Sequence, residues 1–320
     1  MNAIVYTQYG PPEVLRMTEV PRPTPKRDEV LVRVRATTVN RTDCAFRTAD
    51  HFVNRLVSGL FRPRRGILGS ELSGDVVAVG ADVESFRVGD RVFGLSGLRF
   101  GAHAEYVCLP ESAAIAPMPV GMTYEQAAAV SEGAWYALTD LRKAGVGPGQ
   151  RILVYGASGS IGTAAVQLAR HFGADVTAVC STPNVSLVAS LGAERVLDYT
   201  REDWMDTAQA YDVVFDTVGK LSFAQCKRIL RPRGIYMSTE LGFLCQNPIL
   251  ALWTSIAGGQ RVLFPIPTPS KDTTLFVKRL IEAGRYRAVI DRTYRWTDAV
   301  DAYRYVETGQ KVGNVVMTVA

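Results

Sequence analysis

Cysteines are few in this chain of 320 residues, and no two of them are spaced as a C-x-x-C pair. The five lie far apart along the sequence, at Cys44, Cys108, Cys180, Cys226 and Cys245. This spacing argues against a disulfide framework and favours reduced thiols. The N-terminus also lacks the basic and apolar regions of a secretory signal, because residues 1–6 read at once as a strand. We therefore expect a cytoplasmic protein.

A long uninterrupted apolar run is also missing. The longest apolar stretch, residues 241–258, carries Gln246, Asn247 and Pro248 near its middle, which argues against a membrane-spanning helix. The net charge is only +5, and the densest basic run, residues 62–65, has no interleaved aromatic side chains. We expect neither a transmembrane segment nor a nucleic-acid partner. What remains is ordinary globular composition, 47% hydrophobic and 21% charged, in a chain long enough for two domains.

A glycine-rich turn in the middle of the chain carries the strongest functional signal. Residues 151–155 form a short apolar run typical of a buried strand, and residues 163–170 are good helix formers. The turn between them, Ala157-x-Gly159-x-x-Gly162, matches the dinucleotide-binding fingerprint with alanine in first place.

Each part of this motif has a physical role in holding a dinucleotide. Gly159 would let the backbone approach a pyrophosphate, and Gly162 would let the helix pack closely on the strand. The helix N-terminus would then point N–H groups at the phosphates. The alternative is a simple glycine turn, but the flanking strand and helix favour cofactor binding. The predicted cofactor-binding residues of the turn are Ala157, Ser158, Gly159, Ser160, Ile161 and Gly162.

The two halves of the chain have different periodicities. Residues 1–120 contain several short strand-like runs separated by turns, which predicts a β-rich, partly open barrel. From residue 150 onward, strand-like runs alternate with helical ones, which predicts a parallel sheet with right-handed crossovers. The predicted fold class is α/β, with a doubly wound Rossmann sheet beside a smaller β-rich domain.

Three motifs together resemble those of a known family. They are Gly69-x-Glu71-x-x-Gly74, the Val-Gly-Asp-Arg-Val run at residues 88–92, and the turn at Ala157. With them the chain resembles the medium-chain dehydrogenase/reductase superfamily, in particular its zinc-free quinone oxidoreductase branch. The resemblance implies a GroES-like substrate domain at 1–122, completed by 265–320, and a Rossmann NADP-binding domain at 123–264. It further implies an active cleft between the two domains, and a homodimer formed through the strand at 261–264.

The same resemblance also indicates whether the chain binds zinc. Zinc-dependent relatives place a cysteine where this chain has Asn40 and a histidine where it has Ser70. The structural zinc lobe of the family needs four closely spaced cysteines after Val92, and only Cys108 occurs there. Amide and hydroxyl groups are poor zinc ligands. We predict no metal.

The choice of nicotinamide cofactor depends on the turn after the second strand. An NAD-preferring site would carry an acidic residue about twenty residues beyond the glycine turn, and this chain has residues Ser-Thr-Pro-Asn at 181–184. Ser181 and Asn184 can donate to a 2′-phosphate, although the lysine or arginine common in related NADPH enzymes is missing. Tyr199 matches a family tyrosine that contacts this phosphate, and Thr239 matches a position beside the nicotinamide. We predict NADPH.

Without zinc, no Lewis acid polarises the carbonyl group of a simple ketone. A quinone or an α,β-unsaturated carbonyl can instead spread the negative charge that develops during hydride transfer over a conjugated system. The predicted function is NADPH-dependent hydride transfer to such a small, apolar acceptor. The rival functions are a zinc-free alcohol or aldehyde dehydrogenase, and a nucleotide-binding protein with a structural or regulatory role. The candidates for polarising or protonating the acceptor are Asn40, Thr42, Asp43, Ser70, His51 and His103.

Several of these interpretations have plain alternatives. His51 and His103 are more typical of surface or packing histidines, and Asp43 of an orienting group. Glu132 is either a buried functional carboxylate or, in the simpler reading, a solvated or ion-paired one. Phe46 stands near a place where the branch often has tyrosines, which weakens the transfer of catalytic roles.

Residues 241–258 complete the set of predictions. A helix here would carry Ile249, Leu252, Trp253 and Ile256 on one face. This face could pack within the domain or at a dimer interface, or it could lie on a membrane surface. Alternatively, it could form an apolar wall of the acceptor pocket, opposite Phe46.

Overall fold

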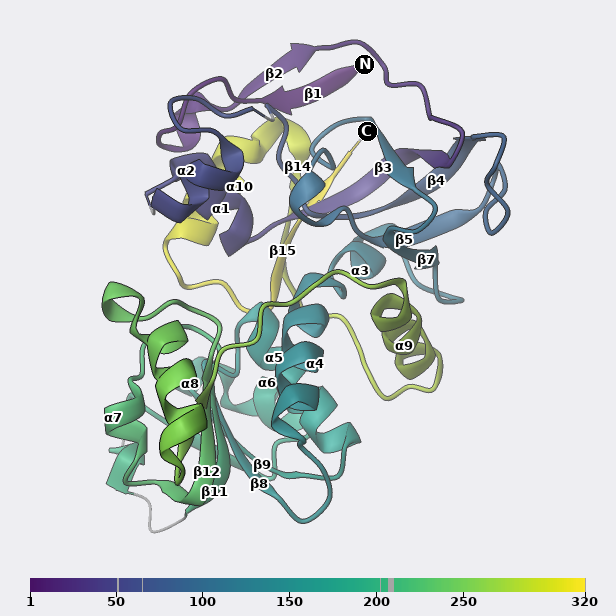
Figure 1. Ribbon diagram of the computed structural model, residues 1–320. Helices are drawn as coiled ribbons and strands as arrows, with labels where there is room; N and C mark the ends of the chain where they lie inside the picture. The colour runs from purple at the N-terminus through teal and green to yellow at the C-terminus, as the bar shows by residue number, and fades with distance from the viewer. Residues whose placement is uncertain (51, 65, 202, 207–209, 320) are drawn as a thin grey trace. The chain divides into compact units, whose positions relative to one another are not determined.

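The computed structural model describes residues 1–50, 52–64, 66–201, 203–206 and 210–319. The chain divides into two compact units. Unit 1 comprises Met1–Glu132 and Pro269–Ala320, and unit 2 comprises Gly133–Thr268. Figure 1 shows the elements of both.

Unit 2 is built on a six-stranded sheet in the order β10-β9-β8-β11-β12-β13, in which every neighbouring pair is parallel. This is the doubly wound Rossmann order, with the reversal of strand order between β8 and β11. Its strands are β8 (Arg151–Tyr155), β9 (Asp175–Cys180), β10 (Arg195–Asp198), β11 (Tyr211–Asp216), β12 (Leu230–Ser238) and β13 (Arg261–Leu263). The prediction of a parallel Rossmann sheet is confirmed.

Helices cover both faces of this sheet, with α5 and α6 on one side and α7 and α8 on the other (Figure 1). The core between sheet and helices contains Leu153, Val214 and Tyr236, all fully buried. The helices are α4 (Glu132–Ala144), α5 (Ser160–His171), α6 (Val185–Ser190), α7 (Phe223–Cys226) and α8 (Gln246–Ala257), with 3-10 turns η3 (Thr182–Asn184), η4 (Trp204–Asp206) and η5 (Phe243–Cys245).

Unit 1 contains a seven-stranded sheet in the order β14-β15-β3-β4-β5-β7, with β6 also paired to β3. The long strand β3 organises it, because β4 pairs along one edge while β6 and then β15 pair along the other. The strands are β3 (Glu29–Val39), β4 (Glu71–Val79), β5 (Arg91–Leu95), β6 (Tyr106–Pro110), β7 (Ala114–Pro117), β14 (Ile290–Arg295) and β15 (Asn314–Thr318), with β1 (Asn2–Val5) and β2 (Arg16–Glu19) in a separate antiparallel pair.

Short helices flank the sheet of unit 1. They are α1 (Arg41–Thr48), α2 (Phe52–Ser58), α3 (Tyr124–Ala128), α9 (Lys271–Glu282) and α10 (Ala299–Glu307), with 3-10 turns η1 (Pro12–Val14), η2 (Gly97–Arg99) and η6 (Trp296–Asp298). Residues 123–132, assigned from the sequence to the Rossmann domain, fall in unit 1 instead. The reason is packing, since α3 lies against β3, β4 and β15. Ser73 Oγ also donates to the backbone oxygen of Tyr124 at 2.6 Å.

In the part of the chain that is described, no helix is long and apolar enough to cross a membrane. The stretch at 241–258 forms the 12-residue helix α8, preceded by the turn η5.

Candidate functional site

The glycine turn of unit 2 has the geometry that a dinucleotide requires. The N–H groups of Gly156 and Ala157 donate to the backbone oxygen of Val179 at 3.2 and 3.1 Å, which anchors the turn to β9. A Cβ on Gly162 would lie 2.1 Å from the backbone oxygen of Gly156, so helix and turn pack too closely for any other residue. A Cβ on Gly159 would meet nothing nearer than 3.5 Å. The fold therefore needs Gly162, whereas the space beside Gly159 is left to an incoming group.

Helix α5 begins directly after this turn. Gly159 is its N-cap residue, and no side chain caps the helix. The N–H groups of a first helical turn, here including Ile161 and Gly162, have no partner within the helix. With the positive end of the helix dipole they favour an anion such as a pyrophosphate. The turn at 157–162 thus fits the phosphates of a dinucleotide.

The predicted 2′-phosphate residues lie together at the carboxyl edge of the sheet. Cys180 on β9 pairs with Asp198 on β10, so the residues that follow, Ser181 and Tyr199, continue side by side. The Tyr199 N–H donates to the Cys180 backbone oxygen at 3.2 Å, and its side chain is 49% exposed. Asn184 Nδ2 donates to Ser181 Oγ at 3.1 Å. The structure therefore groups Ser181, Asn184 and Tyr199.

Asp198 is a neighbour of this group that the sequence did not single out. Burial raises the pKa of its carboxyl, but hydrogen bonds from Thr182 and Thr200 outweigh this, so the pKa is lowered and the group is ionised. The positive charge of Arg201 acts in the same direction. The two threonine hydroxyls are used on Asp198, whereas the predicted residues Ser181, Asn184 and Tyr199 lie beside them. The only sequence signal was an acidic residue at the end of an apolar strand.

Thr239 follows β12 at the same edge of the sheet. Its N–H donates to the backbone oxygen of Asp216, the last residue of β11, at 3.3 Å. The Asp216 carboxylate in turn accepts N–H groups from Val218, Gly219 and Leu221, which fixes the loop after β11. Thr239 is thus held at the carboxyl ends of neighbouring parallel strands, where cofactors bind in such sheets.

In unit 1, Asn40 is the N-cap of helix α1 and not part of a loop. Its Oδ1 accepts the Asp43 N–H at 2.8 Å, and its own N–H donates to Asp43 Oδ2 at 3.2 Å, a reciprocal capping box. Its Nδ2 donates to Ser70 Oγ at 2.8 Å. Both Asn40 and Ser70 are buried. The structure thus brings Asn40, Asp43 and Ser70 together, with their polar atoms directed at one another.

Asp43 is fully buried and ties α1 to the segment before β4. Its Oδ1 accepts the Gly69 N–H at 3.0 Å. Burial raises the pKa of Asp43 to about 7, against the opposing effect of the N–H donors from Gly69 and Asn40. Gly69 has φ +92°, and a Cβ there would lie 2.5 Å from the His103 ring. The motif glycine is therefore required by packing.

Two further buried carboxyls lie beside this network. Glu71 Oε1 accepts the N–H groups of Ser131 and Glu132 at 3.1 and 2.6 Å, and its Oε2 accepts the Thr38 hydroxyl at 2.6 Å. Glu132 Oε1 accepts the Thr42 hydroxyl at 2.7 Å. The interpretation of Glu132 as a solvated carboxylate is wrong, because only 7% of it is exposed. Thr42, in contrast, is half-buried.

The remaining residues considered in the sequence analysis are His103, His51 and Phe46. His103 is fully buried, with Nε2 2.9 Å from the backbone oxygen of Thr38 and Nδ1 3.3 Å from the Tyr303 hydroxyl. Burial lowers its pKa to about 4, so it is a neutral packing histidine. His51 lies outside the described residues. Phe46 belongs to the core of unit 1 and packs on Phe100 with ring centroids 4.9 Å apart, so it is unsuited to line a pocket wall.

Helix α8 presents its apolar side chains outward and its polar ones inward. Asn247 and Thr254 are buried, and Thr254 Oγ1 accepts the Val262 N–H at 3.0 Å. The predicted apolar face is exposed, with Ile249, Leu252, Trp253 and Ile256 between 60% and 83% accessible. Packing of these four side chains into the core of unit 2 is therefore excluded.

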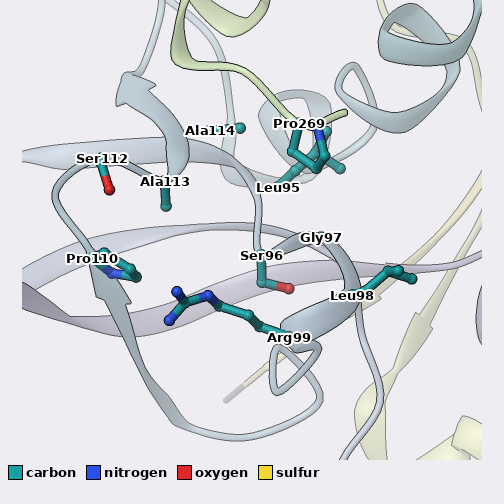
Figure 2. Close-up of a pocket in the computed structure, with 10 residues that line it drawn as sticks. All are labelled: Leu95, Ser96, Gly97, Leu98, Arg99, Pro110, Ser112, Ala113, Ala114 and Pro269. Carbon is teal, nitrogen blue, oxygen red and sulfur yellow. The ribbon is translucent and has the colours of Figure 1, made fainter. Parts of the chain in front are cut away.

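A cavity of about 330 Å³ lies in unit 1, between η2 and the segment from β6 to β7, and is closed on one side by Pro269 (Figure 2). Among the described residues that line it, Arg99 is the only charged one. None of the candidate residues that the structure describes lines it, so it is separate from the Asn40 and Glu132 network.

Two family models match the chain. The alcohol dehydrogenase GroES-like domain matches residues 26–120, and the zinc-binding dehydrogenase domain matches residues 191–317. A 2-methylene-furan-3-one reductase from Solanum lycopersicum is 32% identical, over 99% of this chain and 79% of the relative. An NADPH-dependent alkenal/one oxidoreductase from Arabidopsis thaliana, described as chloroplastic, is 30% identical over the same shares.

Among solved structures, the quinone oxidoreductase from Coxiella burnetii superposes with a TM-score of 0.88. It is 27% identical and covers 100% of this chain and 99% of its own. The match spans both units, so the GroES-like and Rossmann architecture of the chain is confirmed. The chain belongs to the medium-chain dehydrogenase/reductase superfamily, and within it to the quinone and enoyl oxidoreductases.

Proposed function

We propose that this chain is an NADPH-dependent reductase of quinones or α,β-unsaturated carbonyl compounds that works without zinc. The observation that carries the proposal is the turn at 156–162, where Gly162 is required by packing and the space beside Gly159 is open at a helix N-terminus. The names of its relatives, among them an alkenal/one oxidoreductase and a quinone oxidoreductase, support the acceptor class.

Unit 2 would hold the cofactor. The pyrophosphate would lie on the N–H groups of residues 157–162, and Thr239 would lie near the nicotinamide. When bound, the reduced nicotinamide supplies a hydride. The residues of the chain then have to orient the acceptor, stabilise its developing negative charge and provide a proton.

The preference for NADPH over NADH is part of the proposal. Ser181, Asn184 and Tyr199 are grouped and can donate to a 2′-phosphate. Asp198 places a negative charge nearby, which hydrogen bonds from Thr182 and Thr200 and the positive charge of Arg201 stabilise. Support also comes from the relative in Arabidopsis thaliana, whose name specifies NADPH.

In this proposal zinc is excluded because the side chains at the positions of the zinc ligands are poor ligands for it. Where zinc-dependent relatives have two ligands, Asn40 and Ser70 present an amide and a hydroxyl that hydrogen-bond to each other at 2.8 Å. The remaining Asn40 oxygen is used by the Asp43 N–H. Neither group resembles the nitrogen and sulfur ligands that zinc takes. A conjugated acceptor fits such a site better than a simple ketone, because it needs no metal to stabilise its negative charge.

We also propose a cytoplasmic homodimer. All five cysteines are free, as expected where thiols stay reduced. Strand β13 lies at an edge of its sheet, next to the exposed apolar face of α8. An edge strand with an apolar surface beside it is suited to pair with a second copy.

The experiment that tests the proposal is steady-state oxidation of NADPH with quinones, enones, simple aldehydes and simple ketones. We expect turnover with the first two classes and little with the last two. Turnover confined to simple aldehydes or ketones would support the rival alcohol or aldehyde dehydrogenase. Tight NADPH binding without any turnover would indicate a regulatory nucleotide-binding protein.

A further inference from the structure

The side chains of Thr42 and Glu132 form a hydrogen bond to which the proposed function assigns no role. Their side chains meet at 2.7 Å, between the first turn of α1 and the first residue of α4. The carboxyl of Glu132 is buried, whereas the Thr42 residue is half-buried. The hydroxyl therefore connects a carboxyl that water does not reach with the accessible surface of unit 1.

The hydrogen bonds around Glu71 and Glu132 show which of the two acids holds a proton. Glu71 accepts three donors, from Thr38, Ser131 and Glu132, and such donors stabilise a carboxylate. Among the described residues, the side chain of Glu132 accepts a hydrogen bond from the Thr42 hydroxyl alone. Two buried carboxyls near each other do not both ionise readily. This difference favours the charge on Glu71 and the proton on Glu132.

The charged groups around Glu132 agree with this assignment. Burial raises its pKa well above the ordinary value, and the negative charges of Glu71 on β4 and Asp43 on α1 raise it further. Lys311, before β15, acts in the opposite direction, but its own pKa is lowered by burial and its Nζ donates to the Gly313 backbone oxygen at 2.6 Å.

We propose that Glu132 stores the proton that the reduced acceptor takes up, and that the Thr42 hydroxyl passes it on. This inference rests on the proposed function for its substrate. In the protonated state the 2.7 Å contact runs from the Glu132 O–H to Thr42 Oγ1, which leaves the hydrogen of the Thr42 hydroxyl free to donate outward. Thr42 is then the residue that touches the acceptor, and Glu132 acts through it.

The step balances as follows for an enone. The β-carbon of the acceptor gains a hydride with its two electrons, the nicotinamide is oxidised, and the acceptor becomes an enolate. The O–H bond of Thr42 breaks as its proton passes to the enolate. The O–H bond of the Glu132 carboxylic acid breaks as its proton passes to Thr42 Oγ1. Glu132 remains as a carboxylate until a proton from the solvent returns to it through the Thr42 hydroxyl.

The first test does not depend on turnover. The infrared difference spectrum of wild type minus Glu132→Gln at neutral pH should contain the carbonyl band of a protonated carboxylic acid, shifted in D₂O. Asp140 is a second buried acid on α4, and its infrared band cancels in this difference spectrum because both proteins contain it. The variant Asp140→Asn identifies the band of Asp140. Absence of the band assigned to Glu132 overturns the proposal, whether or not the protein reduces enones.

The second test uses turnover of an enone with NADPH. Glu132→Gln keeps the hydrogen bond to Thr42 but has no proton to transfer, and Thr42→Val removes the hydroxyl at constant shape. Each should lower kcat by about 10²–10⁴-fold, the usual range for general acid catalysis. The double variant should be no slower than either single one, and Thr42→Ser should restore activity. Fully additive losses, or equal activity of Thr42→Val and Thr42→Ser, overturn the relay.

The pH profile separates a proton donor from a merely structural carboxyl. Wild-type kcat should be constant while Glu132 is protonated and should fall as pH rises through its raised pKa. Glu132→Gln should be slow and flat over the same range. A descending limb that persists in Glu132→Gln would assign it to another group and contradict the proposal. If the wild type reduces no acceptor at all, the proposed function fails, and the infrared band still decides the state of Glu132.

Discussion

Gly162 on α5 approaches Gly156 so closely that a Cβ at Gly162 would lie 2.1 Å from the Gly156 backbone oxygen and 2.7 Å from Ala157 Cα. Both contacts are with backbone atoms, which cannot move aside as a flexible side chain would. Gly159, three residues earlier, has no such neighbour. The two glycines of the fingerprint therefore differ in their surroundings, because Gly162 is packed inside the fold and Gly159 lies beside open space.

Alanine at these two positions should separate the two roles. Gly162→Ala should destabilise the protein by roughly 1–3 kcal/mol, the usual cost of overpacking. Gly159→Ala should leave the free energy of unfolding nearly unchanged but weaken NADPH binding at least about tenfold, because the new methyl group occupies the space of the pyrophosphate. Chemical denaturation and fluorescence titration measure the two effects. Native NADPH affinity in Gly159→Ala would place the cofactor elsewhere.

The cofactor preference should depend on charge at Ser181. A carboxylate introduced by Ser181→Asp would lie next to Asn184 and Tyr199 and repel a 2′-phosphate, so we expect NADPH to lose its advantage over NADH. Ser190→Asp adds the same charge at the far end of α6 and should leave the preference unchanged. The ratio of the two dissociation constants measures the effect. Equal affinities for NADPH and NADH in the wild type would contradict the assignment.

The stability of the protein should depend on pH through Asp140. Burial raises the pKa of this carboxyl to about 8 in the folded state, whereas in the unfolded chain it returns to about 4. The folded state therefore binds more protons between these values, and stability falls as pH rises from about 4 to 8. For this one group the slope is at most about 1.4 kcal/mol per pH unit.

Asp140→Asn removes this titration. Its free energy of unfolding, compared with wild type at pH 5, 6.5 and 8, should improve steadily with pH. Parallel curves for the two proteins would show that Asp140 is not buried as a neutral acid.

The sequence predicted the local geometry of the candidate cofactor turn better than that of the network around Asn40 and Glu132. The turn at Ala157 joins a strand to a helix through glycines within a dozen residues, so local sequence patterns were enough to predict its structure. The pairing of Cys180 with Asp198 then brought Tyr199 to Ser181, as the resemblance implied. Asp198 itself was overlooked, because an acid after an apolar strand is common and only the two threonine hydrogen bonds reveal its role.

The network around Asn40 and Glu132 depends on contacts between distant segments, which no local pattern encodes. Glu132 is 90 residues from Thr42 along the chain, and its backbone N–H donates to Glu71 on β4. The strand-like runs in residues 1–120 predicted a β-rich domain but not the helix that Asn40 caps. The α8 helix was predicted with its apolar face correct, and only the structure showed that this face points away from the core.

The exposed face of α8 should determine the oligomeric state. Ile256→Glu places a charge at the most exposed apolar position of the helix and should convert the dimer to a monomer in sedimentation velocity experiments. Ser255→Glu, at a neighbouring exposed polar position, is the matched control and should remain a dimer. A monomeric wild type would contradict the dimer.

If the wild type is monomeric, Trp253→Ala becomes the informative variant. An increase in KM for bulky acceptors alone would then favour an apolar wall of the acceptor pocket.

The most direct test of the central claim is transfer of the label from NADPH carrying deuterium at the reactive nicotinamide carbon. The enzyme is incubated with this cofactor and an enone, with a quinone in a parallel reaction that reports turnover alone, and the enone product is analysed by mass spectrometry and NMR. We predict one deuterium per product molecule, at the β-carbon, when the cofactor is labelled on the face that the enzyme uses, and none when the opposite face is labelled. Oxidation of the cofactor with no labelled product from either form, or no reaction with both acceptors at saturating NADPH, would contradict the account.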